Sequence, residues 1–240
     1  MIYSKNKKIH IIKTGETYKC ISSKFGDFED MIINKLSLSI ENVAVWPVYK
    51  DKILPDFEDI DAVIITGSHS MVTDFEDWSL YLADWIKKLS YKDIPMLGIC
   101  YGHQLIAQAF GGVIGYHPHG GEFGSVNILL TENGKQDSLF NIMPDKFYGN
   151  VAHLQSVIKL PPMARVLAGN EFEKNHAFVI NERIWSVQFH PEFNADILNA
   201  YIDESKAILE KNGHDIEVLK QSVVENDLGT KLLKRFIELI

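Results

Sequence analysis

The sequence predicts an α/β fold with a doubly wound, mostly parallel central sheet and helices on both of its faces. Through the first half of the chain, short apolar runs rich in β-branched residues alternate with segments of helical period, as in βαβ units. The runs at residues 62–66 and 95–99 are apolar throughout, which is expected of central strands covered on both faces. With 240 residues, of which 46% are hydrophobic and 23% charged, the chain has the composition of a globular protein of one large or two small domains.

The first half of the chain contains the predicted parallel strands, at residues 8–12, 43–48, 62–66 and 95–99. A helix is predicted between the last two, with Asp77 placed to cap it. Its apolar positions recur with helical period, at Leu82, Trp85, Ile86 and Leu89. This strand–helix–strand unit ends at Cys100.

After Gly111 and Gly112 the pattern changes to short strands separated by turn residues. We expect a mixed or antiparallel extension of the sheet, with strands at residues 125–130, 165–168, 177–180 and 184–188. From Ala195 onward the chain is charged and helical in period. We therefore predict one domain over residues 1–193 and a helical tail over residues 194–240. The tail residues expected to pack back on the domain are Leu232, Leu233, Phe236 and Ile237.

Charge and cysteine content exclude several classes of partner. The chain has 24 Lys and Arg against 32 Asp and Glu, a formal charge of −8, with no basic block, so we expect neither nucleic acid nor membrane as a partner. The apolar stretch at residues 9–12 is too short for a signal sequence or a membrane span. The cysteines Cys20 and Cys100 form no disulfide framework, which favours a cytoplasmic location. His117 and His119 resemble a metal pair but lack a third ligand, so no metal is expected.

Cys100 has the sequence context of a nucleophile. Residues 98–102 read Gly-Ile-Cys-Tyr-Gly between a buried-looking strand and an apolar helix, the form of a nucleophile elbow, in which a strained turn exposes the reactive side chain. A thiol at a helix N-terminus also feels the positive end of the helix dipole. The alternative is a small buried hydrophobic residue at a strand end, the commoner role of a single cysteine.

A base and its orienting acid occur together at residues 188–193, Gln-Phe-His-Pro-Glu-Phe. Because this segment follows an apolar run at residues 184–187, His190 and Glu192 are expected at the sheet edge that carries Cys100. Their spacing lets the carboxylate hold the imidazole and fix its tautomer. Alone this motif is weak, and the elbow 90 residues upstream strengthens it.

Acyl transfer also needs donors for an oxyanion. The backbone N–H of Tyr101, which follows the candidate nucleophile, is one. A second comes from the loop at residues 66–70, where Gly67 has no side chain to block a substrate.

Together the two motifs resemble the class I (triad) glutamine amidotransferase family, and most closely the glutaminase domain of GMP synthase and its stand-alone relatives. The similarity covers residues 8–193 and implies the flavodoxin-like architecture of that family. It implies that Cys100, His190 and Glu192 form a catalytic triad that hydrolyses the glutamine amide through a γ-glutamyl thioester, without a cofactor. It further implies that Gly67 belongs to the oxyanion loop. The substrate-binding positions that it implies are Gln104, His153, Leu154 and Gln155.

The chain departs from the family pattern in two places. Residues 66–70 read Thr-Gly-Ser-His-Ser instead of the usual Gly-Gly-Pro-x-Ser, so a rigidifying proline is absent. Gln155 replaces an aspartate of the substrate pocket. We expect the neutral amide to suit a γ-glutamyl group that carries a leaving amine other than ammonia.

Three functions therefore remain open. The chain has no phosphate-binding loop and no residues for an ATP-using synthetase domain, so a glutamine amidotransferase would deliver ammonia to a separate synthetase subunit. The alternative is a γ-glutamyl hydrolase or peptidase acting on a small-molecule substrate such as a glutathione-like compound. The third is a catalytically inactive regulatory module of the same fold.

Overall fold

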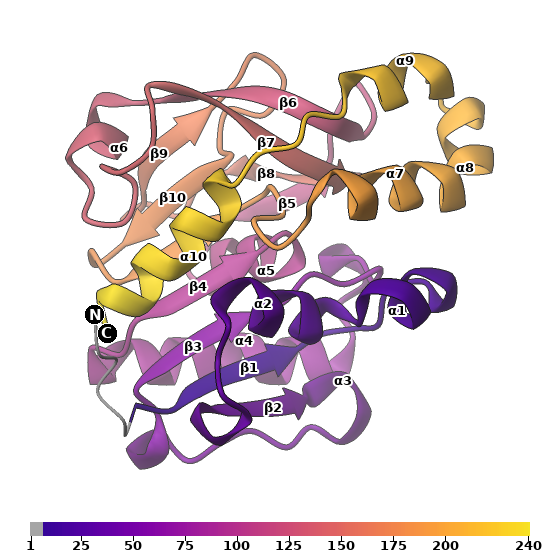
Figure 1. Cartoon of the computed structure of the whole chain (residues 1–240). Coiled ribbons are helices and arrows are strands. Elements are labelled where there is room, and N and C mark those ends of the chain that lie inside the picture. Colours follow the sequence, from indigo (N-terminus) through magenta and orange to yellow (C-terminus); the bar gives the residue numbers. More distant parts are fainter. Residues whose placement is uncertain (1–6) are drawn as a thin grey trace.

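The computed structural model describes residues 7–240, which form a twisted nine-stranded sheet with helices on both faces (Figure 1). The strand order is β2-β1-β3-β4-β11-β10-β9-β6-β7. The first five strands in this order run parallel, and the other four extend the sheet in antiparallel fashion. The predicted fold class and the antiparallel extension are thus confirmed. The strands are β1 (Ile9–Lys13), β2 (Val43–Pro47), β3 (Ala62–Ile65), β4 (Met96–Ile99), β6 (Glu122–Leu130), β7 (Lys146–His153), β9 (Arg165–Gly169), β10 (Ala177–Ile180) and β11 (Ile184–Val187).

Side-chain alternation along the parallel strands divides the apolar core into two layers. Ile9 and Ile11 of β1 point into one layer, under α2 and α10, while Ile12 joins the other, under α4 and α5. Both layers are closed to solvent, which explains why the central strands are apolar throughout. The helices are α1 (Lys19–Phe25), α2 (Phe28–Leu36), α3 (Val48–Asp51), α4 (Asp77–Leu89), α5 (Tyr101–Ala109), α6 (Glu132–Gln136), α7 (Ala195–Glu204), α8 (Lys206–Lys211), α9 (Ile216–Ser222) and α10 (Leu228–Glu238).

Some features of the fold differ from the sequence prediction. Asp77 is the first residue of α4 and not its cap; Glu76 holds the capping position and makes no side-chain cap hydrogen bond. Asp77 instead adds negative charge at the helix N-terminus, which the helix dipole favours. Three strands were not predicted: β7, and the pair β5 (Val113–Tyr116) and β8 (Gln155–Lys159), which form a small second sheet. No helix within residues 7–240 is long and apolar enough to cross a membrane.

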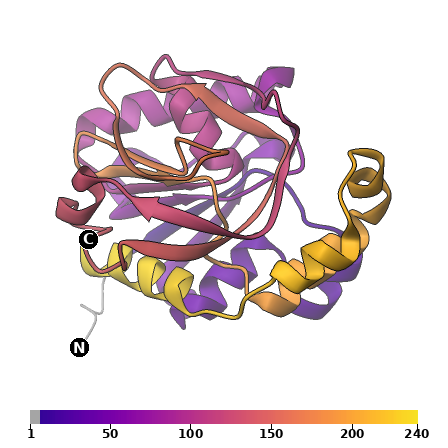
Figure 2. The same ribbon diagram turned by 90° about the horizontal axis from the view of Figure 1, so that it is seen from above.

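The tail begins beside the first helix and returns across the sheet. Its helix α7 contacts α1, and α10 lies against α2 (Figure 2). The ring of Phe236 on α10 meets Trp185 of β11 edge to face at 6.1 Å. Leu232, Leu233 and Ile237 are buried with Phe236 in the same core layer as β1, β3 and β4. The last helix is therefore part of the core.

Replacing Phe236 with alanine tests the contribution of the tail to stability. The substitution leaves a cavity in the core layer under α10, and we expect it to lower the free energy of unfolding by about 3–5 kcal/mol. Urea denaturation measures this difference. Lys234→Ala, on the exposed side of the same helix, is the control and should change it by less than about 0.5 kcal/mol. Equal stabilities of the two variants would contradict a core role for α10.

Candidate active site

Cys100 lies at the junction of β4 and α5 in a strained backbone conformation. Its φ of 49° and ψ of −97° lie on the positive-φ side that side-chain-bearing residues rarely adopt. Two backbone hydrogen bonds hold the turn: Cys100 N–H donates to Val187 O at 2.8 Å, and Gly102 N–H donates to Thr66 O at 3.2 Å. The strain persists because the neighbouring strand ends fix both sides of the turn.

The glycines on either side of the elbow are required by close packing. A Cβ on Gly98 would lie 2.6 Å from the carbonyl oxygen of Gly102, and a Cβ on Gly102 would lie 2.6 Å from that of Ile65. Real Cβ atoms do not come so near to backbone oxygens, so any larger residue must displace β3 or α5. The elbow thus depends on the absence of these two side chains.

His190 and Glu192 meet in the loop after β11. The His190 ring donates from Nδ1 to Glu192 Oε1 at 2.7 Å, and both side chains are buried. The ring of Phe193 stacks on the imidazole with 4.1 Å between centroids. Asn150 of β7 holds the loop at both ends: its carbonyl oxygen accepts from His190 N–H at 2.8 Å, and its side-chain amide donates to Phe193 O at 3.0 Å.

The charges around His190 favour its protonated form. Burial alone would lower the pKa of the imidazole, but the Glu192 carboxylate and the Cys100 sulfur outweigh it and raise that pKa to about 10. His190 therefore carries a proton at neutral pH, beside the sulfur. An imidazolium in this place stabilises negative charge on Sγ and can donate a proton to a departing amine.

The loop after β3 forms the opposite side of this centre. An added Cβ on Gly67 would lie 3.1 Å from His190 Cε1 and 3.7 Å from Cys100 Cβ, so the glycine leaves the space between sulfur and imidazole open. Thr14 Oγ1 donates to Gly67 O at 2.9 Å. Among residues 7–240 the N–H groups of Gly67 and Tyr101 donate to no protein acceptor, as expected of oxyanion donors.

The missing proline of this loop is compensated locally. Ser68 Oγ accepts from the backbone N–H of Ser70 at 3.1 Å, which closes a side-chain turn where the family usually has proline. His69 lies between them, with its ring 4.3 Å from that of Tyr18. Burial and the neighbouring charge of His190 lower the pKa of His69, so a second positive charge is avoided.

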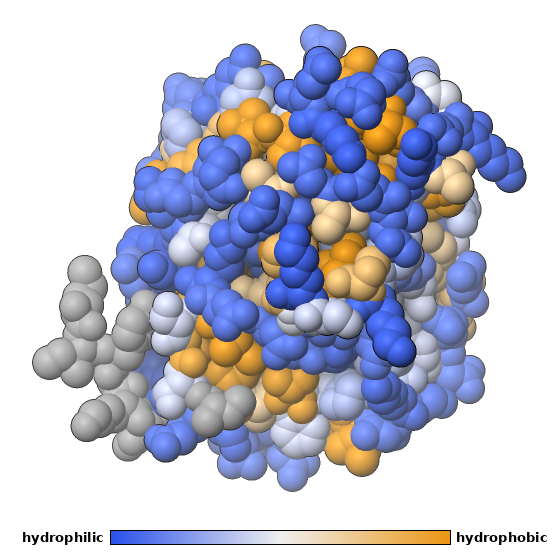
Figure 3. All heavy atoms as spheres, turned by 45° about the vertical axis from the view of Figure 1, so that its right-hand side comes forward, coloured by the Kyte–Doolittle hydropathy of each residue, from blue (hydrophilic) through white to orange (hydrophobic). Residues whose placement is uncertain are grey.

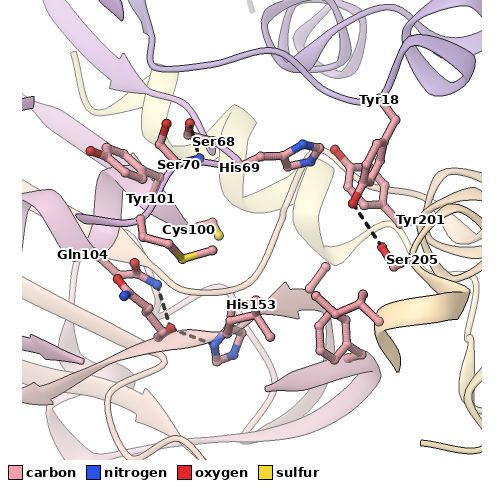
Figure 4. Close-up of a pocket in the computed structure, with 16 residues that line it drawn as sticks. Tyr18, Ser68, His69, Ser70, Cys100, Tyr101, Gln104, His153, Tyr201 and Ser205 are labelled. Atoms are coloured by element: carbon pink, nitrogen blue, oxygen red, sulfur yellow. Dashed lines mark hydrogen bonds between the residues drawn. The ribbon is translucent and has the colours of Figure 1, made fainter. Parts of the chain in front are cut away.

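A cavity of about 220 Å³ opens from Cys100. Gln104 and His153 lie at one end of it, while Tyr18, Tyr201 and Ser205 lie at the other (Figure 4). The predicted positions Cys100, Tyr101, Gln104, His153, Leu154 and Gln155 all contribute to its lining, whereas Gly67, His190 and Glu192 do not.

The Gln155 backbone joins the predicted substrate positions. Its carbonyl oxygen accepts from Gln104 Nε2 at 2.7 Å and from His153 Nδ1 at 3.0 Å. Its side-chain amide donates to Thr73 Oγ1 at 2.6 Å, and within residues 7–240 its buried Oε1 has no partner. This wall therefore presents an unused hydrogen-bond acceptor to the cavity.

Behind this wall lies a buried carboxylate whose role no sequence motif indicated. Glu122 Oε2 lies 3.3 Å from His153 Nε2 and 3.1 Å from His176 Nε2, while Asn170 donates to its other oxygen at 2.8 Å. Burial raises the pKa of Glu122, but these two histidines outweigh it and hold that pKa well below its usual range. Glu122 thus stays ionised and fixes the His153 ring.

Further site residues come from parts of the chain that no local motif marks. Tyr18, His69 and Tyr201 enclose the cavity, and Tyr201 is joined to Thr17 by a hydrogen bond between their hydroxyl groups. Asn150 is a single amide within a strand that was not predicted. An unusual polar residue in a buried strand was the one available indication for Asn150 and Glu122.

The doubly wound sheet with a cysteine elbow beside a buried His–Glu pair defines the class of protein: an α/β chain built like a class I glutamine amidotransferase. The family model described as Glutamine amidotransferase class-I matches residues 24–206, and the chain belongs to that family.

Similar proteins include both peptidases and a GMP synthase component. Gamma-glutamyl peptidase 4 of Arabidopsis thaliana is 32% identical over 67% of this chain and 70% of its own length. The subunit of glutamine-hydrolyzing GMP synthase that matches from Sulfolobus acidocaldarius is 31% identical over 70% of this chain and 85% of its own. A glutamine amidotransferase structure from Thermotoga maritima superposes with a TM-score of 0.75 at 21% identity, covering 97% of this chain and 96% of that one, which shows the shared fold.

Gly102→Ala tests whether the elbow is required for the reactivity of Cys100. The added methyl group must push against the Ile65 carbonyl, so we expect a loss of about 1–3 kcal/mol in stability and at least a tenfold change in the rate of Cys100 alkylation by iodoacetamide. Peptide mapping separates Cys100 from the exposed Cys20. Gly115→Ala is the matched control, because its Cβ would lie at an ordinary 3.4 Å from Ile158. Alkylation of Cys100 at the wild-type rate in both variants would refute the requirement.

Proposed function

We propose that the protein hydrolyses a γ-glutamyl amide through a thioester on Cys100. The observation that carries this proposal is the strained Cys100, set at the end of a closed cavity between two free backbone N–H groups and the buried His190–Glu192 pair. These are the nucleophile, oxyanion donors, base and orienting acid that acyl transfer needs.

The reaction proceeds in two balanced steps. Cys100 Sγ attacks the γ-carbonyl carbon, and the N–H groups of Gly67 and Tyr101 stabilise the oxyanion. His190 donates its proton to the amide nitrogen as the C–N bond breaks, so the amine leaves and the γ-glutamyl thioester remains. A water molecule then gives a proton to His190 and attacks the thioester, which releases glutamate and restores the thiol–imidazole pair.

The glutamyl end is assigned to the wall that contains Gln104, His153, Leu154 and Gln155. The unpartnered Oε1 of Gln155 would accept a hydrogen bond from the α-ammonium group, in place of the aspartate usual in the family. A neutral acceptor gives a weaker contact than an ion pair, so binding of the whole substrate relies more on contacts to the leaving amine.

Two leaving amines are compatible with this centre. With glutamine, the product ammonia would pass to a separate synthetase subunit, as the Sulfolobus relative named for GMP synthase suggests. With a γ-glutamyl peptide, the chain would act alone, as the relatives named gamma-glutamyl peptidase 4 and 3 suggest. The aromatic enclosure by Tyr18 and Tyr201 supports the second, because ammonia needs no such contacts. We assign the activity to the cytoplasm, a reducing compartment that keeps Cys100 a free thiol.

Substitution of the three central residues tests the proposed chemistry. We expect Cys100→Ala to abolish glutamate release from glutamine and from γ-glutamyl peptides, because no other group can form the thioester. His190→Asn should lower kcat by several powers of ten, and Glu192→Gln should lower it less, since the amide still positions the ring. Enzymatic assay of glutamate measures these rates.

Cys20→Ser is the matched control and should keep wild-type turnover, because Cys20 is exposed and contacts only Glu204. Small and equal losses in the three central variants would contradict the triad. An electrophilic glutamine analogue that leaves Cys100 unmodified, as seen by mass spectrometry of the intact protein, would favour an inactive regulatory module instead.

A further inference from the structure

A second cavity of about 290 Å³ adjoins the first and shares two of its walls, Leu154 and Ile208. It lies between α8 and the segment that joins β5 to β6. Ile208 is 43% exposed although it is apolar, and the face that carries the tail helices shows apolar side chains within a largely polar surface (Figure 3). The remaining lining residues are Tyr116, His117, Gly120, Gly121, Lys211 and Asn212.

This cavity lies on the side from which the amine departs. In the proposed reaction His190 protonates the amine, so the leaving group must be on the His190 side of the scissile bond. The Phe193 ring stacks on His190 at 4.1 Å and on Tyr201 of α7 at 4.7 Å, which places α7 on that side. The following helix α8 carries Ile208 and Lys211. Gln104, on the glutamyl wall, lies at the opposite end of the first cavity (Figure 4).

The second cavity offers cationic and donor groups that the protein itself does not use. Lys211 makes no ion pair with any carboxylate among residues 7–240, whereas Lys206 on the same helix lies 3.8 Å from Glu210. An unpaired ammonium in a chain of net charge −8 is a site for an anionic ligand.

His117 adds a fixed donor opposite Lys211. Its Nδ1 accepts from the backbone N–H of His119 at 3.2 Å, so in the neutral ring the proton is on Nε2. Stacking on Phe172, with 4.0 Å between ring centroids, holds the imidazole in place. Lysine and histidine donors beyond an apolar neck match a carboxylate at the far end of a short peptide.

We infer that the leaving amine is a short peptide whose terminal carboxylate binds Lys211 and His117, so that the substrate is a γ-glutamyl peptide. This inference rests on the proposed hydrolysis at Cys100 and adds the identity of the leaving group. Leu154 and Ile208 contact the middle of the peptide, and the second cavity takes its anionic end. Ammonia has no group that reaches this cavity, so Lys211 affects peptides and leaves glutamine unaffected.

The test compares γ-glutamyl-alanyl-glycine with the same peptide ending in a carboxamide, and with glutamine, using the full chain. We expect the wild type to show at least a tenfold lower KM for the acid than for the carboxamide. Lys211→Gln should raise KM for the acid about tenfold, with kcat and both other substrates unchanged, and His117→Gln should act in the same direction. Lys206→Gln is the matched control on the same helix and should behave as wild type.

Each outcome discriminates. Equal KM values for the acid and the carboxamide in the wild type, or equal effects of Lys211→Gln and Lys206→Gln, would overturn the carboxylate site while Cys100-dependent glutamate release left the proposed function intact. Absence of glutamate release from all three compounds would overturn the proposed function itself. All the substituted side chains except His117 are exposed, so loss of folding does not imitate the expected change in KM.

Discussion

The candidate site depends on one backbone constraint, the strained conformation of Cys100 imposed by its neighbouring strand ends. Cys100 N–H is bonded to Val187, the last residue of β11, and Gly102 N–H to Thr66, which follows β3. The three segments that carry the proposed sulfur, base and oxyanion donors thus leave three adjacent parallel strands at one edge, and main-chain hydrogen bonds fix their spacing. Side chains need only small adjustments once this register is set, which explains why two small residues in the elbow matter more than any single polar contact.

A buried ion triplet supports the same edge from the other side. Lys13, at the end of β1, lies 2.7 Å from both Asp27 and Glu29 at the start of α2. Burial on its own lowers the pKa of the Lys13 ammonium, and the two carboxylates outweigh it and raise that pKa. Removing these charges from water is costly, so the triplet contributes position more than stability. It places Phe28, the first residue of α2, with its ring stacked 6.2 Å from that of His190.

The sequence predicts those parts of the fold and site that depend on local spacing. The central strands and the elbow follow from runs of apolar residues and from two glycines within five positions. Strand β7 was missed because Gly149 and Asn150 interrupt its pattern, and its long pairing with β6 is a contact between distant segments. Tyr201 was missed for a related reason: 184 residues separate it from its partner Thr17, and no periodicity in α7 indicates which side chain faces the cavity. Elements were thus predictable, and the enclosure that they form together was not.

The tail links stability to the choice of substrate. Its last helix completes a core layer through Phe236, while α7 and α8 supply Tyr201, Ile208 and Lys211 on the leaving-group side. The glutamyl wall, by contrast, comes from α5, β7 and β8 within the sheet domain. Changes in α7 and α8 can therefore alter the amine that is accepted without disturbing the elbow, because no backbone hydrogen bond of Cys100 or His190 involves these helices. On this arrangement the sheet fixes the chemistry, and the part of the tail before α10 determines which γ-glutamyl compound reaches it.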